Sequence, residues 1–158
     1  VRRLFLDIQD AYLQAETAGK GVTNLSVLQR VLDVLLPAVS EIVSLFVGAF
    51  IVNDLEMALR GEPLEDTIDG LCDEMKLHHV DRLQRGICQL NQGFVFNDLL
   101  TNHERVADHC SNLAVAMIEL ESDSFDTHES LISLKKVRSH SFDQYSEDYR
   151  KKFSLPEV

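Results

Sequence analysis

Apolar residues recur every three or four positions over most of the chain, which is the spacing of one face of an α-helix. The longest series covers residues 24–50 and is apolar on more than one face, which predicts the central helix of a bundle. Pro37 lies inside this series and predicts a kink, because proline lacks a backbone N–H and crowds the preceding turn. Further series predict helices over residues 3–17, 54–85 and 93–120.

Polar and glycine-containing segments separate these helices. Asp54 is expected to cap the third helix, and Gly61-Glu62-Pro63 is expected to interrupt that helix near its start. A short loop over residues 86–93 leads into the fourth helix, and such short connections make consecutive helices antiparallel neighbours. A polar break at residues 122–126 precedes two shorter predicted helices. The last of them carries four aromatic residues on one side: Phe142, Tyr145, Tyr149 and Phe153.

The predicted fold class is all-α: an antiparallel three-helix bundle with an extra N-terminal helix and a helical C-terminal tail. The expected domain boundaries are 1–21 for the N-terminal helix, 22–121 for the bundle and 122–158 for the tail. The composition agrees, because 45% hydrophobic residues in a chain of 158 can form a core. Only 7 Gly and 3 Pro leave room for long helices.

The net charge of −11 argues against binding a nucleic-acid backbone and against docking broadly on an anionic membrane. The longest apolar stretch, between Glu41 and Asn53, is expected to reach about half of the ~20 residues that a membrane span needs. No signal peptide is expected, and the absent initiator Met indicates a fragment of a longer protein. The three cysteines, Cys72, Cys88 and Cys110, form no CxxC and are expected to be free thiols in a reducing cytosol.

Two acid pairs stand out as candidate chemistry: Glu65 with Asp69, and Glu104 with Asp108. Spacing of i, i+4 places both carboxylates of a pair on one helix face, at the border of the apolar stripe. Two such pairs facing each other across antiparallel helices need a counter-charge, which a metal ion supplies. Ligands that are all carboxylates favour Mg²⁺, Mn²⁺ or iron.

Simpler readings of these acids stay open. Acids are common enough in this chain that a single pair at this spacing is expected by chance. Arg105 and Arg82 are candidates to neutralise them as ordinary ion pairs. His103 falls on an apolar stripe, where a hydrogen-bonded core histidine is expected in preference to a metal ligand. The basic C-terminal tail is expected to fold back on the acidic body, and the alternative is that it reaches a partner or the nearby membrane surface.

Longer motifs carry a family resemblance. Residues 104–114 read ERVADHCSNLA and resemble the signature helix ERIxDHxxNIA of the PhoU family, the bacterial phosphate-uptake regulators. Residues 62–71, EPLEDTIDGL, resemble the partner motif on the preceding helix of the same repeat. The resemblance implies a three-helix repeat whose E/D-x-x-x-D motifs bind metal. It assigns Glu65, Asp69, Glu104 and Asp108 as ligands of iron, Zn, Mn or Mg, and it implies no catalytic residues.

Three further segments are similar to one branch of that family, the cytosolic PhoU-like domain fused to Na⁺/phosphate cotransporters: HVDRLQRGIC at 79–88, GFVF at 93–96 and DTHE at 126–129. This similarity implies a location on the cytoplasmic face of the bacterial inner membrane and a cotransporter domain as partner in the same polypeptide. Inorganic phosphate would be involved only indirectly. Only one repeat is complete, since residues 1–17 carry Arg2 and Arg3 where acids would fall. A homodimer is therefore a further expectation.

The resulting functional prediction is a metal-binding regulatory domain, not an enzyme, that modulates phosphate transport and homeostasis. Two alternatives from other classes stay open. One is a metal-free helical adaptor whose acids are merely solvated, and the other is a metal-dependent phosphohydrolase.

Overall fold

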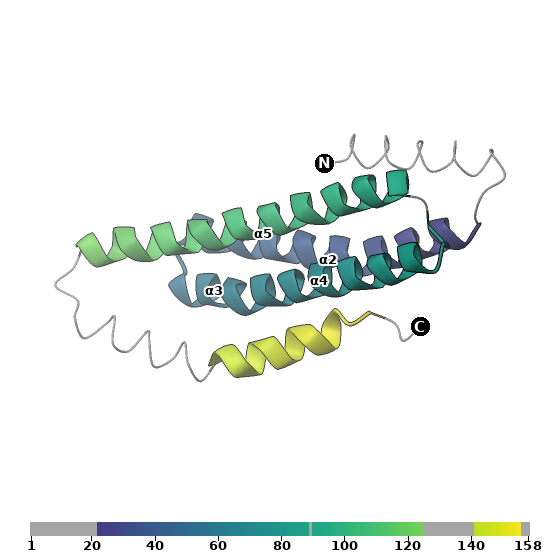
Figure 1. Ribbon diagram of the computed structural model, residues 1–158. Coiled ribbons are helices and arrows are strands. Elements are labelled where there is room, and N and C mark those ends of the chain that lie inside the picture. The colour runs from purple at the N-terminus through teal and green to yellow at the C-terminus, as the bar shows by residue number, and fades with distance from the viewer. Residues whose placement is uncertain (1–21, 89, 125–140, 156–158) are drawn as a thin grey trace. The chain divides into compact units, whose positions relative to one another are not determined.

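The computed structural model describes residues 22–88, 90–124 and 141–155. The chain forms two compact units, Val1–Asp33 and Val34–Val158, and the second contains the helical bundle. The labelled elements are α2 (Val22–Val52), α3 (Leu55–Leu59), α4 (Gly61–Gln84) and α5 (Leu90–Ser124), as Figure 1 shows. No strand occurs within the described ranges, so the predicted all-α class is confirmed. The predicted helix over residues 3–17 lies outside them.

The second helix begins and ends close to its predicted bounds and continues through Pro37. Its buried face has the expected helical spacing, and each fully buried aliphatic or aromatic side chain contributes about 1.5–3 kcal/mol. Its most buried side chains are Leu35, Ala38, Ile42, Phe46 and Ala49. The helix ends at Val52, and the φ of 51° at the following Asn53 lies in the left-handed region that asparagine tolerates.

The third predicted helix is two helices in the structure. Asp54 caps α3 as expected, because its Oδ1 accepts a hydrogen bond from the Met57 N–H at 2.9 Å. The chain breaks at Arg60, and Pro63 lies in the first turn of α4, where its missing N–H leaves no intrahelical bond unmade. The expected interruption at residues 61–63 is therefore a helix start. Phe46 from α2 lies so close to Gly61 that a Cβ there would come within 1.9 Å of its ring.

Helices α4 and α5 form an antiparallel hairpin (Figure 1). Helix α4 has Arg85 as its C-cap, and the following Gly86 has φ of 68°. The N–H groups of Gly86 and Ile87 donate to the carbonyls of Leu83 and Arg82. Helix α5 begins three residues earlier than the predicted start at Gly93. The two helices pack through apolar stripes that include Ile68, Leu71, Met75, Phe96, Leu100 and Ala107.

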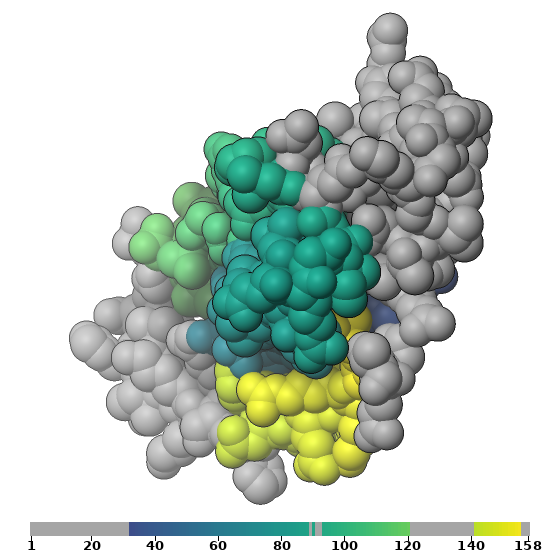
Figure 2. Space-filling view, turned by 45° about the vertical axis from the view of Figure 1, so that its right-hand side comes forward, coloured from purple at the N-terminus to yellow at the C-terminus, as the bar shows by residue number. Residues whose placement is uncertain are grey.

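A C-terminal helix over residues 141–152 packs on the bundle by its aromatic side. Phe153 is buried, and the Arg60 guanidinium lies 5.4 Å from the centre of the Tyr145 ring. Two exposed ion pairs join this helix to the bundle: Arg150 with Asp66 at 3.1 Å and Lys152 with Glu41 at 2.6 Å. Figure 2 shows the helix (yellow) against the teal surface of the bundle. The predicted fold-back of the basic tail is confirmed for this helix.

One stretch, Leu32–Val52, has the length and apolarity of a membrane-crossing helix, with a mean hydropathy of 2.2. The prediction that the longest apolar stretch is only half long enough is therefore wrong, because a span tolerates the isolated charges of Asp33 and Glu41. The interior positions of this stretch pack within the bundle, and 33% of it is buried. Mostly buried core helices of soluble proteins and N-terminal signal sequences meet the same criterion, so length and composition alone do not make this helix a membrane span.

Candidate metal site

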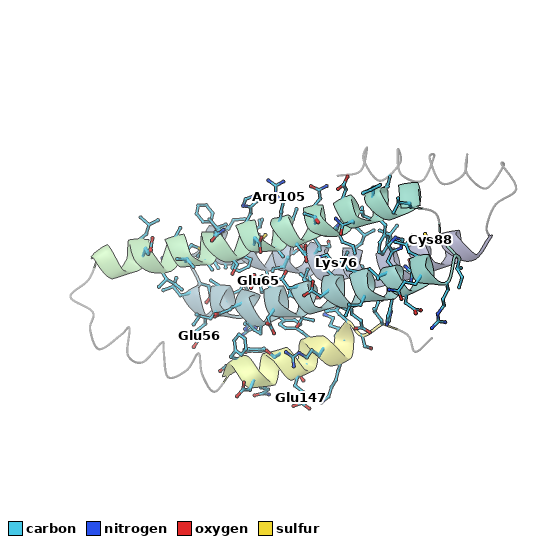
Figure 3. The ribbon with its side chains drawn as sticks, in the orientation of Figure 1. Glu56, Glu65, Lys76, Cys88, Arg105 and Glu147 are labelled. Atoms are coloured by element: carbon cyan, nitrogen blue, oxygen red, sulfur yellow. The ribbon has the colours of Figure 1, made fainter. Side chains whose placement is uncertain are left out.

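Three of the four acids predicted as ligands come together between α4 and α5. Glu65 and Asp69 from α4 and Asp108 from α5 each place a carboxylate oxygen within 4.8 Å of the others. We call these three residues the acid cluster. Glu65 and Asp69 are half-buried and Asp108 is exposed, so the cluster is open to solvent on one side. Figure 3 shows Glu65 at the α4–α5 boundary.

The local sequence positions the acid cluster through the core beside it. Leu64 and Ile68 are fully buried and immediately precede Glu65 and Asp69, so the two carboxylates emerge at the edge of the core. The i, i+4 spacing stacks them one turn apart. On α5, the buried Ala107 precedes Asp108 in the same way, and its small side chain allows the helices to approach closely. The acids therefore face each other because their apolar neighbours pack together.

Glu104, the fourth predicted ligand, is not part of the acid cluster. Its Oε1 accepts a hydrogen bond from Lys76 Nζ at 2.6 Å, across the α4–α5 interface. Lys76 also approaches Asp73 Oδ1 at 3.4 Å. Lys76 was not among the predicted site residues, although its place two turns after Asp69 on the same face of α4 was a usable signal.

The surroundings of the acid cluster disfavour the ionised form of the Glu65 and Asp69 carboxyl groups. Burial raises the pKa of Glu65, and the nearby carboxylates of Asp69 and Asp108 raise it further. Burial likewise raises the pKa of Asp69, followed by the negative charges of Asp108 and Glu104. Asp69 Oδ1 is buried and has no hydrogen-bond partner within the described part of the chain. A buried, unpartnered carboxylate oxygen beside two other acids is a position that a cation would stabilise.

The two arginines considered as counter-charges do not supply one. Arg105 is exposed on the outer side of α5 and makes no ion pair with any described residue (Figure 3). Arg82 lies near the other end of α4, where its guanidinium is 3.4 Å from His79 Nδ1 and 5.9 Å from the centre of the Phe96 ring. Neither arginine neutralises the acid cluster within the described ranges.

A second polar group is buried at that other end of the α4–α5 interface. The His79 ring packs on Phe96 with 4.9 Å between ring centres, and its Nε2 would lie 2.6 Å from a Cβ placed on Gly93. We call His79, Arg82, Gly93 and Phe96 the ring cluster. His79 Nε2 is buried without a hydrogen-bond partner among the described residues. Burial and the charge of Arg82 lower the pKa of His79, so the ring is neutral near pH 7.

The remaining candidate residues have structural roles. His103 Nδ1 is 2.7 Å from the Leu99 carbonyl, so the predicted hydrogen-bonded histidine is confirmed. No disulfide joins Cys72, Cys88 or Cys110, all of which lie in the described part of the chain. Burial raises the pKa of Cys72 to about 12 and that of Cys110 above its usual range. Those two thiols are therefore protonated and unreactive at neutral pH.

The acid cluster suits a hard divalent or trivalent cation. Its ligands are all carboxylate oxygens, which Mg²⁺, Mn²⁺ and iron accept, whereas Zn²⁺ more often takes nitrogen or sulfur ligands. Three carboxylates leave further coordination positions for water or for another ligand. A cation held by these carboxylates would also give the buried Asp69 Oδ1 the partner that it lacks among the described residues.

Comparison with known proteins supports the sequence resemblance. A family model described as the PhoU domain matches residues 32–117, which is more than half of the chain. The matched range contains the acid cluster, Glu104 and Lys76. No curated protein and no solved structure matches the chain.

Proposed function

This chain belongs to the PhoU family, and we propose that it is a metal-binding regulatory domain that modulates phosphate transport. The resemblance to bacterial phosphate-uptake regulators, together with the PhoU-domain match over residues 32–117, supports a regulatory role in phosphate homeostasis. The observation that carries the metal-binding part is the buried, unpartnered Oδ1 of Asp69 inside the acid cluster.

The chain's own residues give such an ion a defined effect. Glu65 and Asp69 belong to α4 and Asp108 to α5, so a cation held by all three would join the two helices. The raised pKa values of Glu65 and Asp69 mean that ionising these groups destabilises the fold when no counter-charge is present. A bound cation reverses that contribution and also supplies a positive charge to which an anion such as phosphate could be attracted.

The expected setting of the domain is part of the same proposal. The segments 79–88 and 93–96, which resemble the domain fused to Na⁺/phosphate cotransporters, support a cotransporter domain as partner in the same polypeptide. This arrangement would place the domain on the cytoplasmic face of the bacterial inner membrane. A homodimer is also part of this proposal. The boundaries 1–21, 22–121 and 122–158 stay a prediction.

Elemental analysis of the purified chain tests the metal site. We expect a transition metal or Mg²⁺ in the wild-type protein and a loss of most of it in the double variant Glu65→Gln, Asp108→Asn, which keeps side-chain size and removes two charges. The matched control is Asp66→Asn, Glu74→Gln, which removes two exposed charges from α4 and should retain the metal. Equal, negligible metal in all three proteins would favour the metal-free adaptor.

Phosphate uptake tests the regulatory part. Cells that express the complete polypeptide should take up radiolabelled phosphate with altered dependence on external phosphate when Glu65→Gln, Asp108→Asn is introduced. The Asp66→Asn, Glu74→Gln control should behave as the wild type. Unchanged uptake with the metal lost would show that the metal does not serve transport regulation.

A further inference from the structure

A lysine ammonium lies in the same interface as the acid cluster. Lys76 is on α4, two helical turns after Asp69, and its Nζ reaches across to Glu104 on α5 at 2.6 Å. The side chains of Lys76 and Glu104 are 31% and 20% exposed, whereas Asp73, the second partner of Lys76, is 74% exposed. The pair with Glu104 is therefore the better shielded of the two. Figure 3 shows Lys76 at the α4–α5 boundary beyond Glu65.

Glu104 interacts with both this ammonium and the acid cluster. Its negative charge contributes to the raised pKa of Asp69, so it acts on the cluster without joining it. The hydrogen bond to Glu104 raises the pKa of Lys76, so the ammonium stays charged at physiological pH. A charge-assisted hydrogen bond of this length is among the stronger polar contacts in proteins.

We propose that Lys76 is a positioning residue that competes with the bound metal for Glu104. The inference rests on the proposed metal-binding function and deepens it. While Lys76 holds Glu104, the ion has the three carboxylates of the acid cluster. Four carboxylates are then shared by two cations: the exchangeable metal ion and the ammonium of Lys76, which is part of α4. The lysine thereby limits both the charge and the number of protein ligands offered to the ion, which sets its affinity.

A double-mutant cycle tests this competition. Mn²⁺ binding to the metal-depleted chain would be measured calorimetrically for the wild type, Lys76→Met, Glu104→Gln and the double variant. We expect Lys76→Met to bind Mn²⁺ about tenfold more tightly, the equivalent of one charged hydrogen bond. Glu104→Gln alone should lower the affinity by less than about threefold, because in this proposal Glu104 is held by the lysine. In the Lys76→Met background, the same Glu104→Gln change should remove the whole gain.

Two controls separate charge from packing. Lys76→Arg keeps the positive charge and a charge-assisted hydrogen bond to Glu104, so it should retain the wild-type affinity within about threefold. Lys151→Met removes an exposed lysine that pairs with Glu147 on the C-terminal helix, and it should leave Mn²⁺ binding unchanged. Circular dichroism of each variant shows whether it is folded. If Lys76→Met fails to fold, the comparison of Glu104→Gln with Asp108→Asn decides, because the proposal requires a much larger loss in Asp108→Asn.

The outcomes distinguish this proposal from the one it rests on. Mn²⁺ bound by the wild type and lost equally in Asp108→Asn and Glu104→Gln would make Glu104 a direct ligand, which overturns the role of Lys76 and leaves the metal site standing. An unchanged affinity in a folded Lys76→Met protein would also overturn it. No Mn²⁺ binding by the wild type, with no change in any variant, would overturn the metal site and this inference together.

Discussion

The acid cluster and the ring cluster occupy the same interface between α4 and α5, and each contains a buried polar atom without a partner among the described residues: Asp69 Oδ1 and His79 Nε2. Their surroundings differ. Asp69 is surrounded by other acids, whereas His79 packs on Phe96 and against Gly93. A neutral imidazole has no charge for the neighbouring Arg82 to repel, so its burial is tolerated with a modest penalty, but neighbouring carboxylates repel one another. A buried atom without a partner therefore indicates a bound ion only where the side chains around it carry charge of the same sign as its own side chain.

The largest effect is expected from a metal ion at the acid cluster. Mn²⁺ at about a thousand times its dissociation constant should stabilise the wild-type chain by about 4 kcal/mol. Asp69→Asn should abolish most of that stabilisation by Mn²⁺. Without metal, the Asp69→Asn protein should be more stable than the wild type, because the substitution removes a repelling charge. Urea unfolding with Mn²⁺ and with EDTA measures both. His79→Phe is the control and should keep the full response to Mn²⁺. If Asp69→Asn gained as much from Mn²⁺ as the wild type, the two clusters would not differ as described.

A glycine substitution tests the packing of the ring cluster. Gly93→Ala would place a Cβ 2.6 Å from His79 Nε2, and such overpacking should destabilise the chain by about 1–3 kcal/mol. Gly70→Ala is the matched change beside Asp69, where a Cβ meets nothing within 4 Å; it should stabilise α4 by about 0.4–1 kcal/mol. Thermal unfolding by circular dichroism measures both. Equal effects of the two substitutions would show that the ring cluster is loosely packed.

The two clusters should respond to pH with opposite signs. The lowered pKa of His79 means that its contribution to stability is present above its ordinary value of 6.5 and is lost as the pH falls below it. The raised pKa values of Glu65 and Asp69 have the opposite effect. The stability that these groups contribute is fully present below their ordinary pKa values of 4.5 and 3.8, and it is lost as the pH rises through the raised values.

Urea unfolding in EDTA at several pH values between about 4.5 and 8 separates these contributions. His79→Phe should lessen the loss of stability below about pH 6.5, and Asp69→Asn should lessen the loss toward neutral pH. A His79→Phe protein with the wild-type loss in acid would show that another group is responsible.

The smallest effect is expected from the exposed acid beside the cluster. Asp66 adjoins Glu65 in sequence but points outward, where it pairs with Arg150 of the C-terminal helix at 3.1 Å. Asp66→Asn should reduce stability by less than about 1 kcal/mol, as for other exposed ion pairs. Its Mn²⁺ affinity, measured by calorimetry, should stay close to that of the wild type. A loss as large as that of Asp69→Asn would mean that the cluster acts through overall acidity.

Much of the bundle could be predicted from the sequence because its periodic apolar stripes are long. The cap at Asp54 and the turn at Gly86 follow from local chemistry that acts within a few residues. The split at Arg60 was missed because a proline in a first turn and a proline in a helix interior look alike until the start of the helix is known. The family resemblance read from residues 62–71 and 104–114 is confirmed by the match over residues 32–117.

The candidate site was harder to predict in full. The pairs Glu65–Asp69 and Glu104–Asp108 have the same spacing, so no local rule separates Asp108 from Glu104. What separates them is the register of two antiparallel helices: Asp108 faces the other acids, whereas Glu104, one turn back along α5, faces Lys76. That register depends on side-chain packing between residues distant in sequence, and a single sequence does not state it.

The hairpin formed by α4 and α5 also bears on how the chain folds. All three acids of the cluster lie in this one hairpin, so they meet as soon as the turn at Gly86 closes. Helical hairpins form early because closing a short loop loses little entropy. During synthesis, the acids would therefore be assembled before the C-terminal helix is added, and an ion captured at that stage would act as a template for the docking steps that follow.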